Sequence, residues 1–366
     1  DSGKEIVISH NTDNGYLQMI SRSTVGNGSW SEQQITSGYD MLWNRSAIGG
    51  INGETIHMIG ITAPTGFGGL PFNGLDGALL YYRSPDAGVT WDITQMQLPT
   101  LNSINFDGMK GDTYSIDAQG NTVVIAYFDD WGDSFILKST DNGDTWARKT
   151  FLDFPVDNYI LDQGIDLDNN GIMDMVYSTD NYGTVILDAN NQAHVFYGIM
   201  AYLDDDLTDS TSVWYPSVNG IAYWNESMGE DITPPIPHSG DVDLWYSDLM
   251  VNNWIVESPD INGDGLVGGI DSTGGYALYY ASRASMPSAG IDSLGNLYLS
   301  FSGYTETAAN GTFSAPRGKV QLAGNFEPAG TWIHNNGTLD VHRLVTFFGY
   351  NFNDRTSFIS EVEFEH

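Results

Sequence analysis

Two octapeptides in the first half of the chain share one pattern of residues. Residues 84–91 and 139–146 both read Ser-x-Asp-x-Gly-x-Thr-Trp, and about 55 residues separate them, a period typical of repeat architectures. Gly tolerates the left-handed backbone of a tight turn, and the Asp carboxylate can accept backbone N–H groups across that turn. The Trp can pack between neighbouring units. Each octapeptide therefore predicts a turn between two strands of an internally repeated structure.

A second repeat is a turn rich in Asp, Asn and Gly that precedes an alternating apolar strand. It occurs at residues 116–121, 187–192 and 291–296, with a weaker copy at 49–53. Each copy predicts a hairpin turn that leads into a half-buried or buried strand.

Incomplete octapeptides extend the repeat toward both ends of the chain. Residues 23–30 and 325–332 keep the final Trp. We expect an all-β fold, a β-propeller of about six four-stranded blades of roughly 60 residues each, with five or seven blades as alternatives. The last strands, at 344–350 and 357–364, are expected to close the ring against the first two. The whole chain, residues 1–366, is expected to be a single domain.

The octapeptide resembles the Asp-box, also called the BNR repeat, of sialidase-like propellers, many of which are secreted and are not sialidases. The resemblance implies that these turns lie on the face away from the active site and are not catalytic. Sialidases of this kind carry an Arg-Ile-Pro motif and three arginines that hold the substrate carboxylate. This sequence has no Arg-Ile-Pro, and no motif brings three of its eight arginines together; several stand in strands or beside the octapeptides, where a structural role is expected. The resemblance is therefore one of scaffold.

The charge of the chain restricts its partners. It has 47 acidic and 13 basic residues, a formal net charge of −34, which repels nucleic acid and anionic membrane surfaces. No apolar run is long enough to span a bilayer, and without cysteine there is no disulfide and no thiolate metal site. The chain begins at Asp1 without Met or a signal sequence, as a mature secreted protein would. We expect an extracellular or cell-surface location and exclude a nucleic-acid partner.

Two insertions interrupt the repeat, at about residues 155–182 and 228–274, and each contains an oxygen-rich loop. Oxygen ligands at alternate positions around a Gly-assisted turn are how a short loop surrounds Ca²⁺. The first loop resembles the calcium loops of FG-GAP-type repeats, and the second resembles an EF-hand or dockerin loop; the alternative is that both are chance products of an Asp-rich composition. The candidate ligands of structural calcium are Asp166, Asp168, Asn170, Ile172 and Asp174 in the first loop, and Asp260, Asn262, Asp264, Leu266 and Asp271 in the second.

The loops expected opposite the octapeptide turns are acidic and aromatic. In a propeller, the loop after the second strand of each blade opens on that face, where ligands usually bind. A carboxylate ligand would be repelled there, whereas a neutral glycan can stack on aromatic rings and donate hydrogen bonds to carboxylates, and a cationic partner is attracted. The candidate ligand-binding residues are Asp129, Asp130, Trp131, Tyr202, Asp204, Asp205, Asp206, Tyr304, Glu306, Tyr350 and Asp354.

The leading hypothesis is a calcium-stabilised extracellular or cell-surface propeller that binds a glycan or a protein partner without catalysis. No catalytic residue is assigned. One alternative is a glycoside hydrolase that uses carboxylates of the acidic face, one with a raised pKa and one ionised. Another is a structural subunit of a surface assembly, which also fits an acidic, stable fold.

Overall fold

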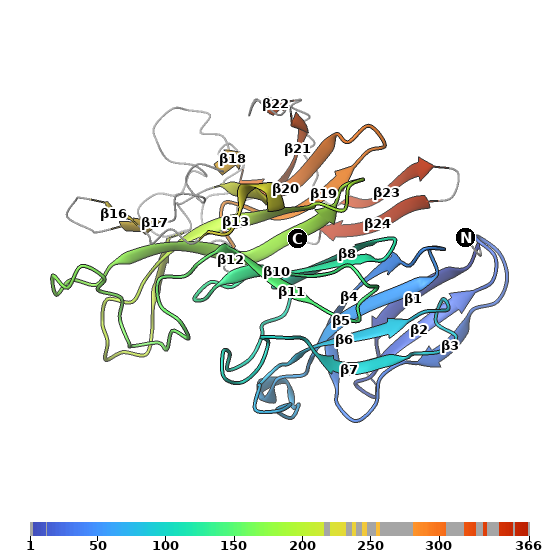
Figure 1. The fold of residues 1–366 in the computed structure, drawn as a ribbon, viewed down its shortest axis with the longest axis horizontal. Helices are drawn as coiled ribbons and strands as arrows, with labels where there is room; N and C mark the ends of the chain where they lie inside the picture. Colours follow the sequence, from blue (N-terminus) through green and yellow to red (C-terminus); the bar gives the residue numbers. More distant parts are fainter. Residues whose placement is uncertain are drawn as a thin grey trace.

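The computed structural model describes residues 3–11, 13–215, 220–231, 236–238, 244–246, 254–256, 281–304, 318–326, 332–334, 344–353 and 356–364. Within these ranges the chain is all-β apart from two single-turn 3-10 helices, and its strands form six sheets in chain order (Figure 1). The same ranges contain no helix with the length and apolar character needed to cross a membrane.

The first three sheets are antiparallel meanders. Sheet 1 contains β1 (Glu5–His10), β2 (Leu17–Arg22) and β3 (Ser31–Gln34). Sheet 2 contains β4 (Met41–Gly49), β5 (Thr55–Thr62), β6 (Leu79–Ser84) and β7 (Ile93–Gln97), with the 3-10 helix η1 (Thr65–Phe67) after β5. Sheet 3 contains β8 (Tyr114–Gln119), β9 (Thr122–Tyr127), β10 (Ser134–Ser139) and β11 (Ala147–Leu152).

The remaining sheets differ in size. Sheet 4 contains β12 (Met175–Leu187), β13 (Ala193–Leu203), β14 (Val213–Tyr215), β15 (Ile221–Asn225), β16 (Ile236–His238), β17 (Leu244–Tyr246) and β18 (Trp254–Val256), with η2 (Glu226–Met228) after β15. Sheet 5 contains β19 (Ala284–Ile291), β20 (Leu297–Tyr304), β21 (Gly318–Phe326) and β22 (Trp332–His334). Sheet 6 contains β23 (Leu344–Asn353) and β24 (Thr356–Phe364).

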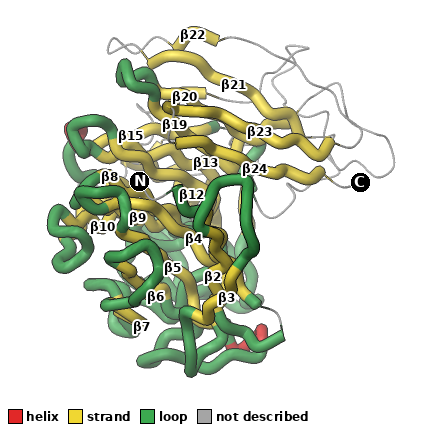
Figure 2. The backbone as a smooth tube through the Cα atoms, turned by 90° about the vertical axis from the view of Figure 1, so that its right-hand side faces the viewer, coloured by secondary structure: helices red, strands yellow, loops and turns green. Residues whose placement is uncertain are grey.

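The first strands of successive sheets lie next to one another, and we call β1, β4, β8, β12 and β19 the inner strands. β1 contacts β4, β4 contacts β8, β8 contacts β12, and β12 contacts β19. Figure 2 shows sheets 2 to 5 following one another from the bottom to the top of the molecule. Apart from the parallel pairing of β12 with β17 in sheet 4, the described strands pair antiparallel, and sheets with adjacent first strands follow one another in this way in a β-propeller. Within the described ranges β23 and β24 pair only with each other, so the expected ring closure against β1 and β2 is not seen there.

The core explains why every residue of β9 is buried. Successive side chains of a strand point to opposite faces. Ile125 and Tyr127 join the apolar cluster shared with sheet 2, whereas Val124 and Ala126 join the cluster shared with sheet 4. Sheet 3 is thus covered on both faces, as a sheet between two neighbours must be.

The hairpin turns predicted from the second repeat are confirmed at β8–β9, β12–β13 and β19–β20. The Asp side chain acts within its own turn: the backbone N–H of Gln192 donates to Asp188 at 2.7 Å, and that of Asn296 donates to Asp292 at 2.9 Å. Inner strand β12 begins at Met175, within the predicted insertion at 155–182.

The octapeptides form the turns β6–β7 and β10–β11, as predicted. In each turn the Thr N–H and hydroxyl both donate to the Asp carboxylate, at 2.7 and 2.7 Å for Asp86 and at 2.9 and 2.6 Å for Asp141. The ring of Trp146 packs edge-on against Tyr81 of the preceding sheet, with ring centroids 5.1 Å apart. The octapeptides are therefore structural.

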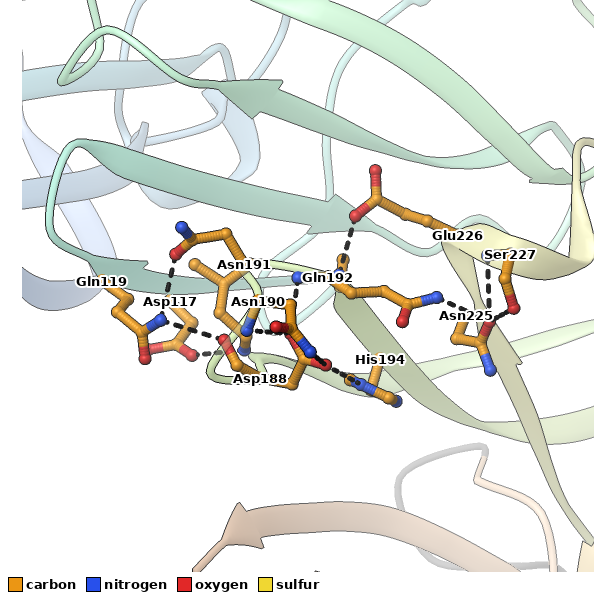
Figure 3. Close-up of polar contacts among 12 residues, drawn as sticks. Asp117, Gln119, Asp188, Asn190, Asn191, Gln192, His194, Asn225, Glu226 and Ser227 are labelled. Carbon is orange, nitrogen blue, oxygen red and sulfur yellow. Dashed lines mark hydrogen bonds and ion pairs between the residues drawn. The ribbon is translucent and has the colours of Figure 1, made fainter. Parts of the chain in front are cut away.

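Side chains of β8 form hydrogen bonds with backbone groups of the neighbouring sheet, sheet 4 (Figure 3). Asp117 accepts the N–H of Leu187 at 2.7 Å, and the Gln119 amide donates to the carbonyl of Asp188 at 2.9 Å. These contacts join sheets 3 and 4 on the face that carries the octapeptide turns.

Candidate ligand site among the inner strands

Three inner strands contain a bulge with a strained residue. The register shifts near the start of β4 and β19 and in the middle of β12. There Trp43, Asn181 and Met286 have left-handed φ angles of 47°, 70° and 50°. Left-handed backbone is costly for residues other than Gly, and bulges of this kind re-aim side chains at functional sites.

A cavity of about 480 Å³ lies among these strands and is lined by Arg45, Asp112, Tyr114, Tyr182 and Met286, among others. Arg45 on β4 forms an ion pair with Asp112, which precedes β8. Burial raises the pKa of Tyr114, so its hydroxyl keeps its proton. The cavity thus combines aromatic rings with one balanced pair of charges.

Asp129 and Asp130, which follow β9, have pKa values displaced in opposite directions. Burial and the charge of Asp130 raise the pKa of Asp129 to about 6. Burial also acts against ionisation of Asp130, but Lys110, whose Nζ lies 2.5 Å from it, holds the pKa of Asp130 below its ordinary value. A carboxyl that takes up a proton near pH 6 therefore lies beside one that stays ionised. Neither Asp129 nor Asp130 is among the residues that line the cavity.

Asp180 is a further buried carboxyl, which the sequence did not indicate. It is completely buried in the β12 bulge, and burial raises its pKa to about 6. It accepts the backbone N–H groups of Tyr182 at 3.1 Å and Ser282 at 2.8 Å, and so joins β12 to the segment before β19. A carboxyl without solvent exposure, held by two backbone donors, has a structural role here.

Trp131 and Tyr202, two of the predicted ligand-binding residues, pack together. The rings of Trp131 and Tyr159 are stacked with centroids 4.7 Å apart, and the ring of Tyr202 lies 5.4 Å from Trp131. The buried Tyr202 donates its hydroxyl to the carbonyl of Thr179 at 2.7 Å. Both side chains therefore support the loop around Asp129.

The three predicted aspartates after β13 differ in solvent exposure. Asp204 is buried and accepts the hydroxyl of Tyr159 and the N–H of Asp162, so it anchors the loop before β12. Asp205 and Asp206 are exposed. For Tyr304 and Tyr350 the structure gives only a place in β20 and β23, and Glu306 and Asp354 lie outside the described residues.

The first predicted calcium loop turns around Asp166. Its carboxylate accepts the N–H groups of Asn170 and Gly171, each at 3.0 Å, and the buried Asp174 accepts the N–H of Leu167 at 2.7 Å. Carboxylate, amide and carbonyl oxygens are the donors that Ca²⁺ prefers. Across the part of the chain that is described, no three His, Cys, Asp or Glu side chains are grouped so that they could hold a metal ion. The second loop, with Asp260, Asn262, Asp264, Leu266 and Asp271, lies outside that part.

Two of the described arginines, Arg83 and Arg45, lie in different surroundings. Arg83 forms ion pairs with Asp92 and Asp144 at 2.7 Å each, beside the octapeptide turns, as expected for a structural residue. Arg45 lines the cavity, whereas the sequence predicts an acidic and aromatic face. The sequence around Arg45 does not indicate a site residue, because its ion-pair partner, Asp112, lies 67 residues away.

No family model and no curated protein matches this sequence. The solved structures similar to the chain include a sialidase of Streptococcus pneumoniae (NanB), with 13% identity, a TM-score of 0.32, and coverage of 62% of this chain and 29% of that one. An α-L-arabinanase of Penicillium chrysogenum has 11% identity, a TM-score of 0.40, and coverage of 87% and 74%. A protein of unknown function from Dyadobacter fermentans has 10% identity, a TM-score of 0.39, and coverage of 92% and 84%. The chain thus spans less than a third of the streptococcal sialidase. The TM-scores are low, so the class of the protein, an all-β chain of successive blade-like sheets, rests on its own sheets.

Proposed function

We propose that this chain is an extracellular or cell-surface, calcium-stabilised β-propeller that binds a neutral glycan in the cavity among its inner strands, without catalysis. The observation that carries the proposal is the cavity of about 480 Å³ lined by the Arg45–Asp112 pair and by Tyr114 and Tyr182. Small-molecule sites typically have volumes of roughly 300–1,000 Å³ and a few placed polar groups among aromatic side chains.

The charges around the cavity favour a neutral ligand. Arg45 is paired with Asp112, and Lys110 is paired with Asp130, so neither cation is left to attract a carboxylate. Sugar hydroxyls both donate and accept hydrogen bonds, so they can bridge a guanidinium and a carboxylate. The half-buried ring of Tyr182 provides apolar surface for the C–H groups of a sugar, whereas the ring of Tyr114 is buried.

The test is binding of a panel of neutral oligosaccharides by calorimetry. Asp112→Asn removes a surface ion pair worth about 0–1 kcal/mol of stability, so the fold should persist while affinity falls by about tenfold or more. Glu5→Gln, which breaks the Arg22–Glu5 pair of sheet 1, is the matched control and should leave binding unchanged. If no glycan binds, or if both variants bind alike, the proposal is wrong.

Glycoside hydrolysis is the second candidate, and the displaced pKa values of Asp129 and Asp130 favour it. A protonated Asp129 would be the general acid, and such activity would be lost as the pH rises through about 6. Because Asp129 and Asp130 are hydrogen-bonded to each other, the second carboxylate, which must lie about 5–10 Å from the acid, would come from another strand. The assay is turnover of a panel of aryl glycosides. Turnover that Asp129→Asn abolishes and the exposed Asp205→Asn retains would replace the non-catalytic proposal with this one.

The calcium in this proposal is supported by the oxygen donors of the 166–174 loop. Ca²⁺ at one hundred times its dissociation constant would stabilise the fold by about 2.7 kcal/mol. We expect Ca²⁺ to raise the melting temperature, EDTA to lower it, and Asp166→Asn to reduce the difference, whereas Asp205→Asn should not. A melting temperature independent of Ca²⁺ and EDTA would contradict this part.

A further inference from the structure

We propose that Trp43 and Phe67 form a second sugar-binding subsite at the edge of the cavity, so that the ligand is an oligosaccharide of at least two units. This inference rests on the proposed function and deepens it by naming the length of the ligand. We call the two side chains the aromatic corner, because their rings are nearly perpendicular, at 88°, with centroids 5.3 Å apart.

Phe67 is held in solvent by a rigid loop. Its side chain is 67% exposed. The N–H and hydroxyl of Thr65 both donate to the Asp76 carboxylate, at 2.6 and 2.7 Å. A Cβ at Gly69 would lie 1.7 Å from the carbonyl oxygen of Ala63, so the loop closes tightly on itself. The loop therefore holds a large aromatic ring in contact with water.

Trp43 is fixed from the other side. Its left-handed backbone lies in the β4 bulge, and its carbonyl accepts the Tyr114 hydroxyl at 2.5 Å. Its ring lies against Gly111, where a Cβ would be 2.7 Å from the indole. The strained conformation and the missing side chain at position 111 both serve to place this ring.

The aromatic corner adjoins the cavity through shared residues. Tyr114, which binds the Trp43 carbonyl, lines the cavity, as do Asp112, next to Gly111, and Arg45, two residues after Trp43. A chain of sugars with one unit in the cavity would therefore continue onto the corner.

The chemistry of the corner suits a pyranose ring. One face of a pyranose is apolar because its C–H groups point that way, and it can lie on the face of one aromatic ring while the perpendicular ring contacts its edge. The hydroxyls at the rim of the sugar stay in water. An apolar protein side chain is the competing occupant, and it would need only apolar surface, not the face of an aromatic ring.

The experiment compares ligand lengths by calorimetry, with gluco-, galacto-, manno- and xylo-oligosaccharides of one to four units as probes. For a series that binds, the wild type should gain about tenfold or more in affinity from one unit to two. Phe67→Ala should cost the disaccharide about tenfold, equivalent to about 1.4 kcal/mol, and leave the monosaccharide unchanged. Phe67→Leu, which keeps apolar bulk without a ring face, should show the same loss. Val89→Ala, at a similarly exposed residue of an octapeptide turn, should show none.

The outcomes separate the two proposals. If no series binds the wild type, both are refuted. If sugars bind but Phe67→Ala leaves the length dependence intact, or Phe67→Leu restores the wild-type affinity, only the aromatic corner is refuted as a sugar subsite.

Discussion

Burial of His57 makes the fold sensitive to mild acid. The ring on β5 is completely buried, and its Nδ1 lies 2.7 Å from the Tyr81 hydroxyl. Burial, together with the charge of Arg83, lowers the pKa of His57 from 6.5 to about 4. The unfolded chain therefore takes up a proton near pH 6.5, whereas the folded protein does so only near pH 4. This stabilisation is present above pH 6.5 and is lost as the pH falls toward 4.

The size of the effect follows from the two pKa values. The full difference between 6.5 and about 4 corresponds to about 3 kcal/mol, of which about 2 kcal/mol is lost by pH 5. His57→Gln cannot titrate, so the stability difference between wild type and variant should shrink by about 2 kcal/mol between pH 7.5 and pH 5. Urea unfolding at both pH values measures this stability difference. Both values lie above the isoelectric point of about 4.1, at which the solubility of the protein would fall.

His194 provides a matched control. Its Nδ1 also lies 2.7 Å from a tyrosine hydroxyl, that of Tyr223. Burial lowers the pKa of His194, but the carboxylate of Asp188 opposes the shift. His194→Gln should therefore change the acid sensitivity less than His57→Gln does. A His57→Gln variant with the same stability deficit at both pH values would refute the reasoning.

Three further predictions use other features of the fold. Asp141→Ala removes the acceptor of three hydrogen bonds in its turn and should lower the free energy of unfolding by about 2 kcal/mol, measured by urea unfolding. Asp141→Asn should lower it less, and equal losses for the two variants would contradict a role for the carboxylate charge. Gly198→Ala places a Cβ 2.3 Å from the Asp180 carboxylate and should cost about 2–3 kcal/mol in the same assay, whereas Gly290→Ala, with no neighbouring atom within 4 Å, should stay within about 0.5 kcal/mol. Because burial raises the pKa of Asp129 to about 6 in the folded protein, the wild type should lose about 1 kcal/mol of stability relative to Asp129→Asn between pH 5 and pH 7, as urea unfolding can establish.

The sheets and turns could be predicted from the sequence because their signals are local. Asp188 and Asp292 each bind an N–H four residues ahead, so the turn is specified by adjacent residues. The start of β12 could not be predicted, because Ser178, Thr179 and Asp180 are buried polar residues that break the apolar alternation of a strand.

The site could be predicted only in part. Asp129 and Asp130 follow an apolar strand, so their place at the end of β9 was predictable. Arg45 lies on β4 and Asp112 precedes β8, so they meet only because β4 lies beside β8. The aromatic corner likewise depends on a bulge and on a loop closure, and neither has a simple sequence pattern.

The contacts in which β8 holds the next sheet by its backbone bear on how this protein can vary. Asp117 and Gln119 bind the N–H of Leu187 and the carbonyl of Asp188. Main-chain groups survive any change of side chain, provided that the turn keeps its shape. Selection can therefore replace the residues of a neighbouring unit almost freely while the joint between units persists. A scaffold joined in this way can diverge far in sequence and still present new side chains from the same arrangement of sheets.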